Sequence, residues 1–137
     1  MHLPSITAIY LGVLALLYAA LAIQVARLRQ RDRAAFGDNG SVELRTAIRV
    51  HANFAEYVPI ITLMVAFLEM SGLPTMRVHL LMGTLLLSRL LHPLGMYAKP
   101  NTLQFRIGRV GGITITFFVL ISCAVAILWR AWNGMAS

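Results

Sequence analysis

The sequence predicts an all-α membrane protein, an antiparallel bundle of four transmembrane helices in a single domain. Hydrophobic residues make up 58% of the 137 residues, and charged residues only 12%. A soluble domain carries about a quarter charged residues, so most of this surface would not face water. Four long apolar runs are separated by short polar segments, and consecutive helices joined by short loops run antiparallel. We expect one domain over residues 1–137.

The apolar runs and the breaks between them predict where each helix begins and ends. The first run is long enough to cross the ~30 Å of a bilayer's hydrocarbon. Its basic residues follow the apolar stretch instead of preceding it, which distinguishes it from a cleavable signal. Ser41 is expected to cap the second helix, and Trp129 and Trp132 suit an interfacial anchor in the fourth. The helices are expected at about 3–27, 42–70, 75–97 and 103–132.

The positive charges predict an orientation in the membrane. Residues 27–49 carry Arg27, Arg29, Arg31, Arg33, Arg45 and Arg49 against only three acids, and the third connection carries Lys99, Arg106 and Arg109. The second connection and the termini offer only Arg77 and Arg130. The positive-inside rule therefore predicts cytoplasmic first and third loops and external termini. We expect a multi-pass membrane protein that contacts membrane lipids.

Two other classes are disfavoured. The net charge of +7 could suggest nucleic acid, but the basic residues flank apolar runs, as topology signals do, so we expect no nucleic-acid partner. The histidines His2, His51, His79 and His92 lack metal-ligand spacing, so we expect no metal. The single cysteine, Cys123, lies in an apolar run and is expected to be a small buried or lipid-facing residue.

Polar side chains inside the second and third helices are the main functional signal. At about 100° per residue, Arg45, Arg49, Asn53 and Glu56 fall within one stripe of the second helix, and His51 points away from it. Ionised groups in a membrane helix are costly and usually face the bundle interior or mark function. The structural alternative is an ion pair between Glu56 and Arg49 or Arg89 that pins helices together.

On the third helix, Arg89, His92 and Met96 share a stripe, and Tyr97 is displaced from it. The arginines of the second, third and fourth helices outnumber Glu56, the one acid expected to be buried with them. Surplus arginines at a membrane edge need anions, which are either lipid phosphates or a bound anionic ligand.

These residues carry a resemblance to a known family. Residues 49–59, Arg-Val-His-Ala-Asn-Phe-Ala-Glu-Tyr-Val-Pro, resemble the second-helix signature of the MAPEG family, the membrane-associated proteins in eicosanoid and glutathione metabolism. The segments around Arg27, Arg89 and Arg106 are similar to the family's arginine segments in the other helices. The resemblance extends over nearly the whole chain, which looks like the small bacterial members. It therefore implies a location in the bacterial inner membrane.

The resemblance implies a homotrimer with glutathione bound between neighbouring subunits near the cytoplasmic face. Carried over by position, Arg106 would be the catalytic residue that favours the glutathione thiolate, because a nearby cation lowers a thiol pKa. Arg27 and Arg49 would hold carboxylates, and Glu56 would meet the ammonium. His51 and Asn53 would hydrogen-bond the peptide, and Tyr57 would line the pocket. The implied glutathione-binding set is Arg27, Arg49, His51, Asn53, Glu56, Tyr57, Arg89, His92 and Tyr97.

The implied activity is a glutathione-dependent transferase or peroxidase that acts on hydrophobic electrophiles or lipid hydroperoxides. Glutathione would serve as co-substrate. One position departs from the family: Met96 stands where several family enzymes have Tyr, and Tyr97 follows one residue later. Met96 therefore favours the first alternative, a non-catalytic membrane protein that binds a lipid or an anionic ligand. A structural trimer is the other alternative.

Overall fold

The computed structural model describes residues 3–99 and 101–135, and confirms a four-helix antiparallel bundle. His2 and Pro100, expected in a terminus and a loop, lie outside the described residues. Within that part of the chain there is no strand. The elements are α1 (Ser5–Arg31), α2 (Val42–Met70), α3 (Thr75–Met96), α4 (Leu103–Phe105), the π-helical η1 (Arg106–Gly111) and α5 (Gly112–Met135).

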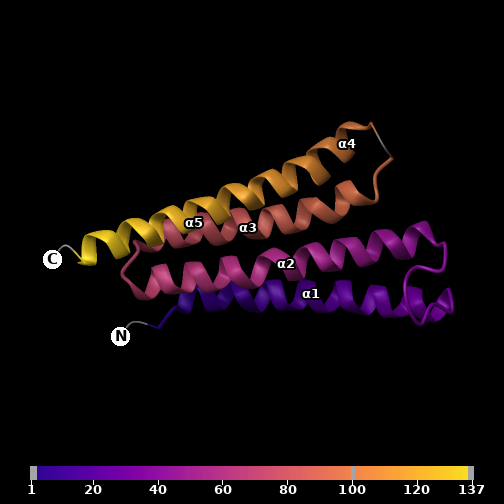
Figure 1. The fold of residues 1–137 in the computed structure, drawn as a ribbon, viewed down its shortest axis with the longest axis horizontal. Helices are drawn as coiled ribbons and strands as arrows, with labels where there is room; N and C mark the ends of the chain where they lie inside the picture. Colours follow the sequence, from indigo (N-terminus) through magenta and orange to yellow (C-terminus); the bar gives the residue numbers. More distant parts are fainter. Residues whose placement is uncertain (1–2, 100, 136–137) are drawn as a thin grey trace.

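The four long helices span the membrane side by side. Each is long and apolar enough to cross a bilayer, with α4, η1 and α5 counted as one continuous helix. Figure 1 shows the first and last described residues at one end of the bundle, together with the α2–α3 turn. The α1–α2 and α3–α4 connections lie at the other end. The helices α2 and α3 pack against each other, and α1 and α5 each pack against both of them.

Helix ends follow local chemistry. The Ser41 hydroxyl accepts a hydrogen bond from the Leu44 amide at 3.3 Å, which confirms the expected cap of α2. The α2–α3 turn contains Gly72 at φ +82°, a left-handed conformation that glycine adopts at little cost. The expected end of the first helix near residue 27 is wrong, because α1 continues to Arg31. Arg29 and Arg31 suit the negative end of its dipole.

The sequence predicted one continuous α-helix at about 103–132, but the fourth helix is divided into the segments α4, η1 and α5. Its second segment, η1, is a six-residue π-helical turn, a distortion often found at functional sites. Here α3 and the fourth helix approach closely through Gly95 and Gly108: a Cβ on Gly108 would come within 2.4 Å of the Gly95 backbone. Gly112 packs against His92 and Ser88. Gly108 and Gly112 therefore allow close helix approach, as small residues do in membranes, whereas a Cβ on Gly111 would meet nothing closer than 4.0 Å.

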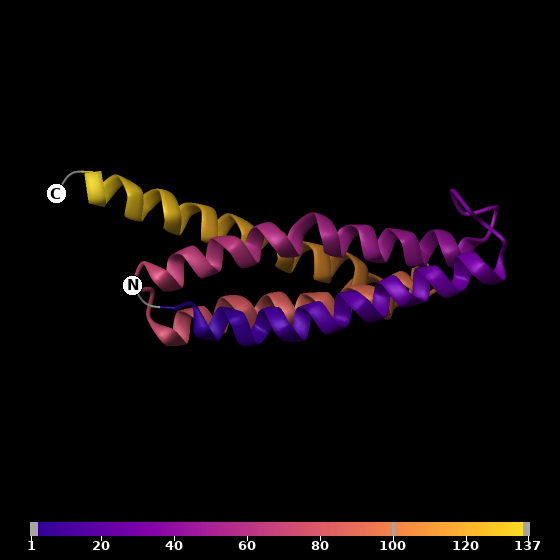
Figure 2. The same ribbon diagram turned by 90° about the horizontal axis from the view of Figure 1, so that it is seen from below.

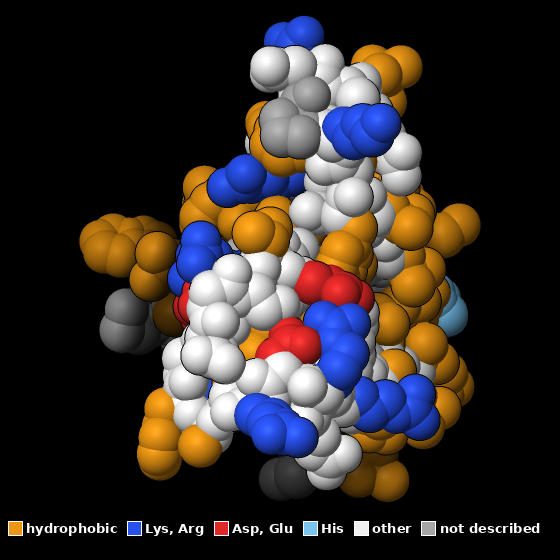
Figure 3. Space-filling view, turned by 90° about the vertical axis from the view of Figure 1, so that its right-hand side faces the viewer, with side chains coloured by type: hydrophobic (Ala, Val, Ile, Leu, Met, Phe, Trp, Pro, Cys, Tyr) orange, Lys and Arg blue, Asp and Glu red, His pale blue; other side chains and the backbone are white. Residues whose placement is uncertain are grey.

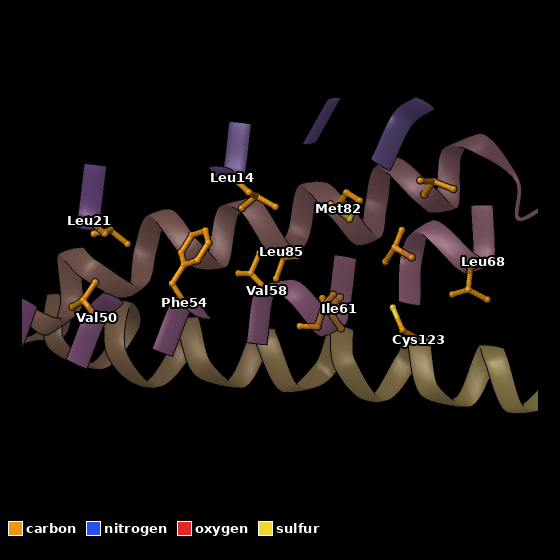
Figure 4. Packing of buried hydrophobic residues seen from close by; sticks show 13 residues of the cluster. Leu14, Leu21, Val50, Phe54, Val58, Ile61, Leu68, Met82, Leu85 and Cys123 are labelled. Atoms are coloured by element: carbon orange, nitrogen blue, oxygen red, sulfur yellow. The ribbon is translucent and has the colours of Figure 1, made fainter. Parts of the chain in front are cut away.

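The core runs along the middle of the bundle. Figure 4 shows Leu14, Phe54, Leu85 and Ile61 directed between the helices, with Cys123 reaching in from α5. Cys123 is fully buried, in agreement with the expectation of a small buried residue. This packing fixes the rotation of α2 and α3, and therefore the direction in which their polar side chains point.

Candidate functional site

A polar pocket lies between α2, α3 and the start of the fourth helix. It has a volume of about 140 Å³, and its lining comes from all three helices. Two arginines line it, one from α2 and one from η1. The lining residues are Arg49, Asn53, His92, Met96, Arg109 and Ile113. We refer to this as the Arg49 pocket.

Arg89 lies behind Asn53 with only 2% of its surface exposed. Its guanidinium donates to the Asn53 amide oxygen at 2.8 Å and to the Ser88 hydroxyl at 3.2 Å. It also donates to the Thr116 hydroxyl, which in turn donates to the Gly112 carbonyl at 2.8 Å. No carboxylate pairs with Arg89 among the described residues. A positive charge is therefore buried in the bundle on neutral partners alone, which is costly without a nearby anion.

The buried arginine fixes what Asn53 can offer. A guanidinium only donates hydrogen bonds, so the amide oxygen of Asn53 must face Arg89. The NH₂ group of Asn53 is then directed away from Arg89 as a donor. Asn53 lines the Arg49 pocket, so the pocket presents a fixed donor beside its arginines.

His92 and Arg109 complete the pocket wall. His92 is 5% exposed, and its Nδ1 atom is buried without a hydrogen-bond partner in the part of the chain that the structure describes. The Arg109 guanidinium lies 5.3 Å from the centre of the Phe105 ring, a cation–π contact one helical turn away. An unpartnered buried polar atom beside two arginines indicates a site that a polar, anionic ligand can complete.

The ion pair expected for Glu56 is absent. Glu56 is exposed on the outer face of α2 and has no ion-pair or hydrogen-bond partner within residues 3–99 and 101–135. Arg89 uses Asn53 instead, because Asn53 lies on the inner side of the stripe. Arg45 is also drawn away from the stripe, into an ion pair with Asp38 in the α1–α2 connection.

Several other predicted site residues lie apart from the pocket in one subunit. The His51 ring stacks on Tyr18 of α1, with ring centres 4.6 Å apart. Tyr57 packs edge-on against Phe117 of α5 at 5.4 Å. Tyr97 accepts a hydrogen bond from Gln24 of α1 at 2.9 Å. Arg27 and Arg106 are exposed.

The end of the bundle nearest this pocket is basic. Figure 3 views that end, where blue Lys and Arg side chains are widely spread and the red acids lie beside them. Arg31 binds Asp32 at 2.7 Å and Glu43 at 2.9 Å. Hydrogen bonds from Arg45 and the Gly40 amide hold the pKa of Asp38 below its usual range. The acids of this end are thus occupied in the connection and leave the pocket's arginines uncompensated.

Sequence reasoning missed Arg109 as a pocket residue. The sequence pattern counts Arg109 only among the positive charges of the third connection. The signal was Gly95, Gly108 and Gly112, which allow the two helices to touch where η1 turns Arg109 towards His92. The displacement of Tyr97 from the stripe of Arg89, His92 and Met96 is confirmed, since Met96 lines the pocket and Tyr97 turns to α1.

The described residues contain no group of three or more His, Cys, Asp or Glu side chains that could hold a metal ion. The groups available in the pocket are guanidinium, amide and imidazole. This set suits carboxylates and peptide groups.

Comparison with known proteins gives the family. The MAPEG family profile matches residues 7–129. Two curated relatives, both named "Inner membrane protein YecN", come from Escherichia coli strain K12 and from Escherichia coli O6:H1 strain CFT073. Each is 38% identical over 124 residues, which cover 90% of this chain and 91% of the relative. No solved structure matches the chain at a significant level. The chain, a four-helix membrane protein, belongs to the MAPEG family.

Proposed function

We propose that the protein is a glutathione-dependent membrane transferase or peroxidase acting on hydrophobic electrophiles or lipid hydroperoxides. The observation that carries the proposal is the Arg49 pocket, where Arg49 and Arg109 stand beside the buried Arg89 without a paired acid among the described residues. Membership of a glutathione-associated family supports glutathione as the anion. Glutathione brings two carboxylates, which would offset this positive charge.

The pocket's groups suit one part of glutathione. Arg49 and Arg109 would hold a carboxylate, and the NH₂ group of Asn53 would donate to a peptide carbonyl. His92 would find a partner for Nδ1 in the bound ligand. A volume of about 140 Å³ is below the ~300 Å³ at which small-molecule pockets begin, so the tripeptide would extend beyond one subunit.

The second part of the site would come from a neighbouring copy in a homotrimer. Glu56 is exposed in a membrane-spanning helix with no described partner, an arrangement that lipid makes costly. Between subunits it would meet the glutathione ammonium and be shielded from lipid. Arg27, His51, Tyr57 and Tyr97 lie outside the Arg49 pocket, and we propose that they line the site across the same interface.

Arg106 would stabilise the glutathione thiolate. It is exposed at the first residue of η1, where a ligand sulfur could approach from the membrane edge. A neighbouring cation favours the thiolate, the nucleophilic form. In transfer, the sulfur forms a bond to the electrophilic carbon as the leaving group departs with its electron pair. With a hydroperoxide, sulfur attacks oxygen, the O–O bond breaks to release an alcohol, and a second glutathione yields disulfide and water.

The proposed location is the bacterial inner membrane, with the first and third loops in the cytoplasm. The name of the Escherichia coli relatives supports the membrane assignment. The spread of Lys and Arg over the end seen in Figure 3 supports the orientation. Glutathione would then enter from the cytoplasm and an apolar substrate from the bilayer.

One observation favours a second candidate, a protein that binds an anionic ligand without catalysis. Met96, not a tyrosine, lines the pocket, and the nearby Tyr97 hydroxyl bonds Gln24. The ligand would then lose one hydroxyl contact. Binding by the arginines does not depend on that contact, so the two candidates differ in turnover and not in affinity.

Ultraviolet difference spectroscopy tests the proposal. Purified protein in detergent is titrated with glutathione up to millimolar concentration, and the thiolate absorbance is measured. Wild type should show a saturable signal, and Arg106→Ala should abolish it while glutathione still binds in equilibrium dialysis. Arg109→Ala should instead weaken binding itself. Absence of both signal and dialysis binding in wild type overturns the proposal.

Turnover then separates the activities. A chlorinated aromatic electrophile reports transfer, and an organic hydroperoxide reports peroxidase activity. Thiolate formation with neither turnover would support the binding-only alternative.

A further inference from the structure

A second groove lies at the opposite end of the bundle, where the termini and the α2–α3 turn are. It has a volume of about 830 Å³ and is walled on one side by α5 and on the other by the start of α3. Figure 2 shows the C-terminal part of α5 diverging from α1 and α3 towards this end. None of its lining residues belongs to the Arg49 pocket.

The floor of the groove is apolar and follows one stripe of α5. Phe118, Ile121, Val125 and Trp129 recur at three- to four-residue intervals, and all four are exposed. From Phe118 to Trp129 the helix rises about 16 Å at 1.5 Å per residue. One leaflet of a bilayer has ~15 Å of hydrocarbon depth. The stripe therefore matches the length of one leaflet, with Trp129 at the level where tryptophan anchors helices to the interface.

The mouth of the groove is positively charged. Arg77 comes from the first turn of α3, and Arg130 from the last turns of α5. The Arg130 guanidinium donates to the Ser71 carbonyl, which holds it against the α2–α3 turn. Neither arginine has an ion pair with any acid that the structure describes. The nearby amide side chain of Asn133 also lines the mouth.

We propose that this groove binds an anionic phospholipid of the leaflet at this end of the bundle. The phosphate would lie between Arg77 and Arg130, and one acyl chain would lie along the stripe from Trp129 to Phe118. A purely apolar ligand would leave the two arginines without an anion. A free phosphate would leave the apolar floor exposed. A phospholipid satisfies both parts, because its charge and its chain are separated as the groove's are.

The inference is independent of the proposed function. The two sites lie at opposite ends of the bundle, and loss of one leaves the residues of the other unchanged. The lipid is therefore a bound structural or regulatory partner and not the substrate of the glutathione site.

Trp129 provides the probe, because the chain has only two tryptophans. In a Trp132→Phe background, Trp129 fluorescence is measured in phosphatidylcholine nanodiscs that contain increasing fractions of phosphatidylglycerol with brominated acyl chains. Bromine quenches a tryptophan only at close range. We expect half-maximal quenching at about a tenfold lower mole fraction than with brominated phosphatidylcholine, since each arginine near a surface favours anionic lipid.

The double variant Arg77→Gln/Arg130→Gln should abolish this preference. The matched control, Arg33→Gln/Lys99→Gln, removes the same charge from exposed positions at the other end and should retain it. Equal quenching by both lipids in the Trp132→Phe protein, or loss of preference in the control, would overturn the proposal. Absence of quenching by either lipid would also overturn it, because a protein surface would then cover the groove. Size-exclusion elution and thermal unfolding establish that each variant is folded.

Discussion

Polar groups find charged partners in one region of the molecule and lack them in another. We compare the Glu69 cluster, which is Glu69 with the Ile6 and Thr7 groups that it accepts hydrogen bonds from, with the Arg49 pocket. At the end with the termini, Glu69 accepts hydrogen bonds from the Ile6 amide at 3.0 Å, the Thr7 amide at 2.9 Å and the Thr7 hydroxyl at 2.6 Å. The carboxylate thus caps the first turn of α1. At the Arg49 pocket, Arg89 has only neutral partners and His92 Nδ1 has none among the described residues.

The comparison separates polar groups that have their partners within the fold from polar groups that we propose bind a ligand. Glu69 satisfies orphan amides at a helix start, where its negative charge also suits the helix dipole. Its cluster is complete within one chain. The pocket is incomplete by one anion, and membrane burial makes such a deficit expensive. Variants of the Glu69 cluster should therefore change stability, and variants of the pocket should change ligand binding.

The largest expected effect comes from Gly108→Ala, which should lower both the stability of the fold and ligand binding at the pocket. The new methyl would lie 2.4 Å from the Gly95 backbone, so α3 and the fourth helix must move apart. We expect a loss of about 3 kcal/mol or more in stability together with loss of glutathione binding. Gly111→Ala, whose methyl meets nothing closer than 4.0 Å, is the control. Thermal unfolding in detergent measures both, and equal behaviour of the two variants would refute the close approach.

Glu69→Ala should lower stability without weakening glutathione binding. It leaves the Ile6 and Thr7 amides and the Thr7 hydroxyl without their acceptor. We expect a cost of about 1.5–3 kcal/mol. Thermal unfolding and equilibrium dialysis of glutathione are compared for the same preparation. If the variant unfolds like wild type, Glu69 does not stabilise the fold. If it binds glutathione several-fold more weakly, the Glu69 cluster is not separate from ligand binding.

Arg89→Met should weaken glutathione binding without lowering stability. The side chain is buried without an acid, and replacing a buried charge by an apolar side chain of similar length is often neutral or stabilising. Asn53 loses the donor that fixes its amide, and the pocket loses positive charge. We expect unchanged or higher thermal stability and about 10- to 100-fold weaker glutathione binding. Unchanged affinity would show that Arg89 has no part in binding.

The smallest effect is expected for Asp38→Asn at the ion pair with Arg45. The pair is exposed, so the unfolding temperature should fall by only about a degree at neutral pH. The folded pKa of Asp38 is lowered, so its contribution is full above the unfolded pKa of about 4 and disappears as the pH falls through the folded value. Unfolding scans from pH 7 to 3 should show wild type and variant converging. A difference that grows towards acid would contradict this sign.

The sequence predicted the helices and the polar stripes because hydropathy and the 100° period depend only on residue order. Asn53, His92 and Met96 were placed on the correct faces for this reason. The partner of Arg89 was not predicted, since an asparagine and an acid three residues apart are both within reach until packing fixes the rotation of α2. The π-helical turn that brings Arg109 to the pocket depends on the contact between Gly95 and Gly108, which lie on different helices.

The Glu69 cluster was missed for a similar reason. An antiparallel bundle places the end of α2 beside the start of α1, but the order of residues does not indicate that the Glu69 side chain accepts hydrogen bonds from the Ile6 and Thr7 amides. The residues that lie apart from the pocket in one chain, such as His51 and Glu56, could be assigned a site only through the family resemblance.

We propose that the Arg49 pocket lacks one anion and that glutathione supplies it. Asn53→Asp tests it most directly, because it places a carboxylate within hydrogen-bond reach of Arg89 with almost no change in shape. Isothermal titration of glutathione into the variant and wild type is the measurement. Wild type should bind glutathione at millimolar or lower concentration, and Asn53→Asp should not. Equal binding by the two proteins would contradict it.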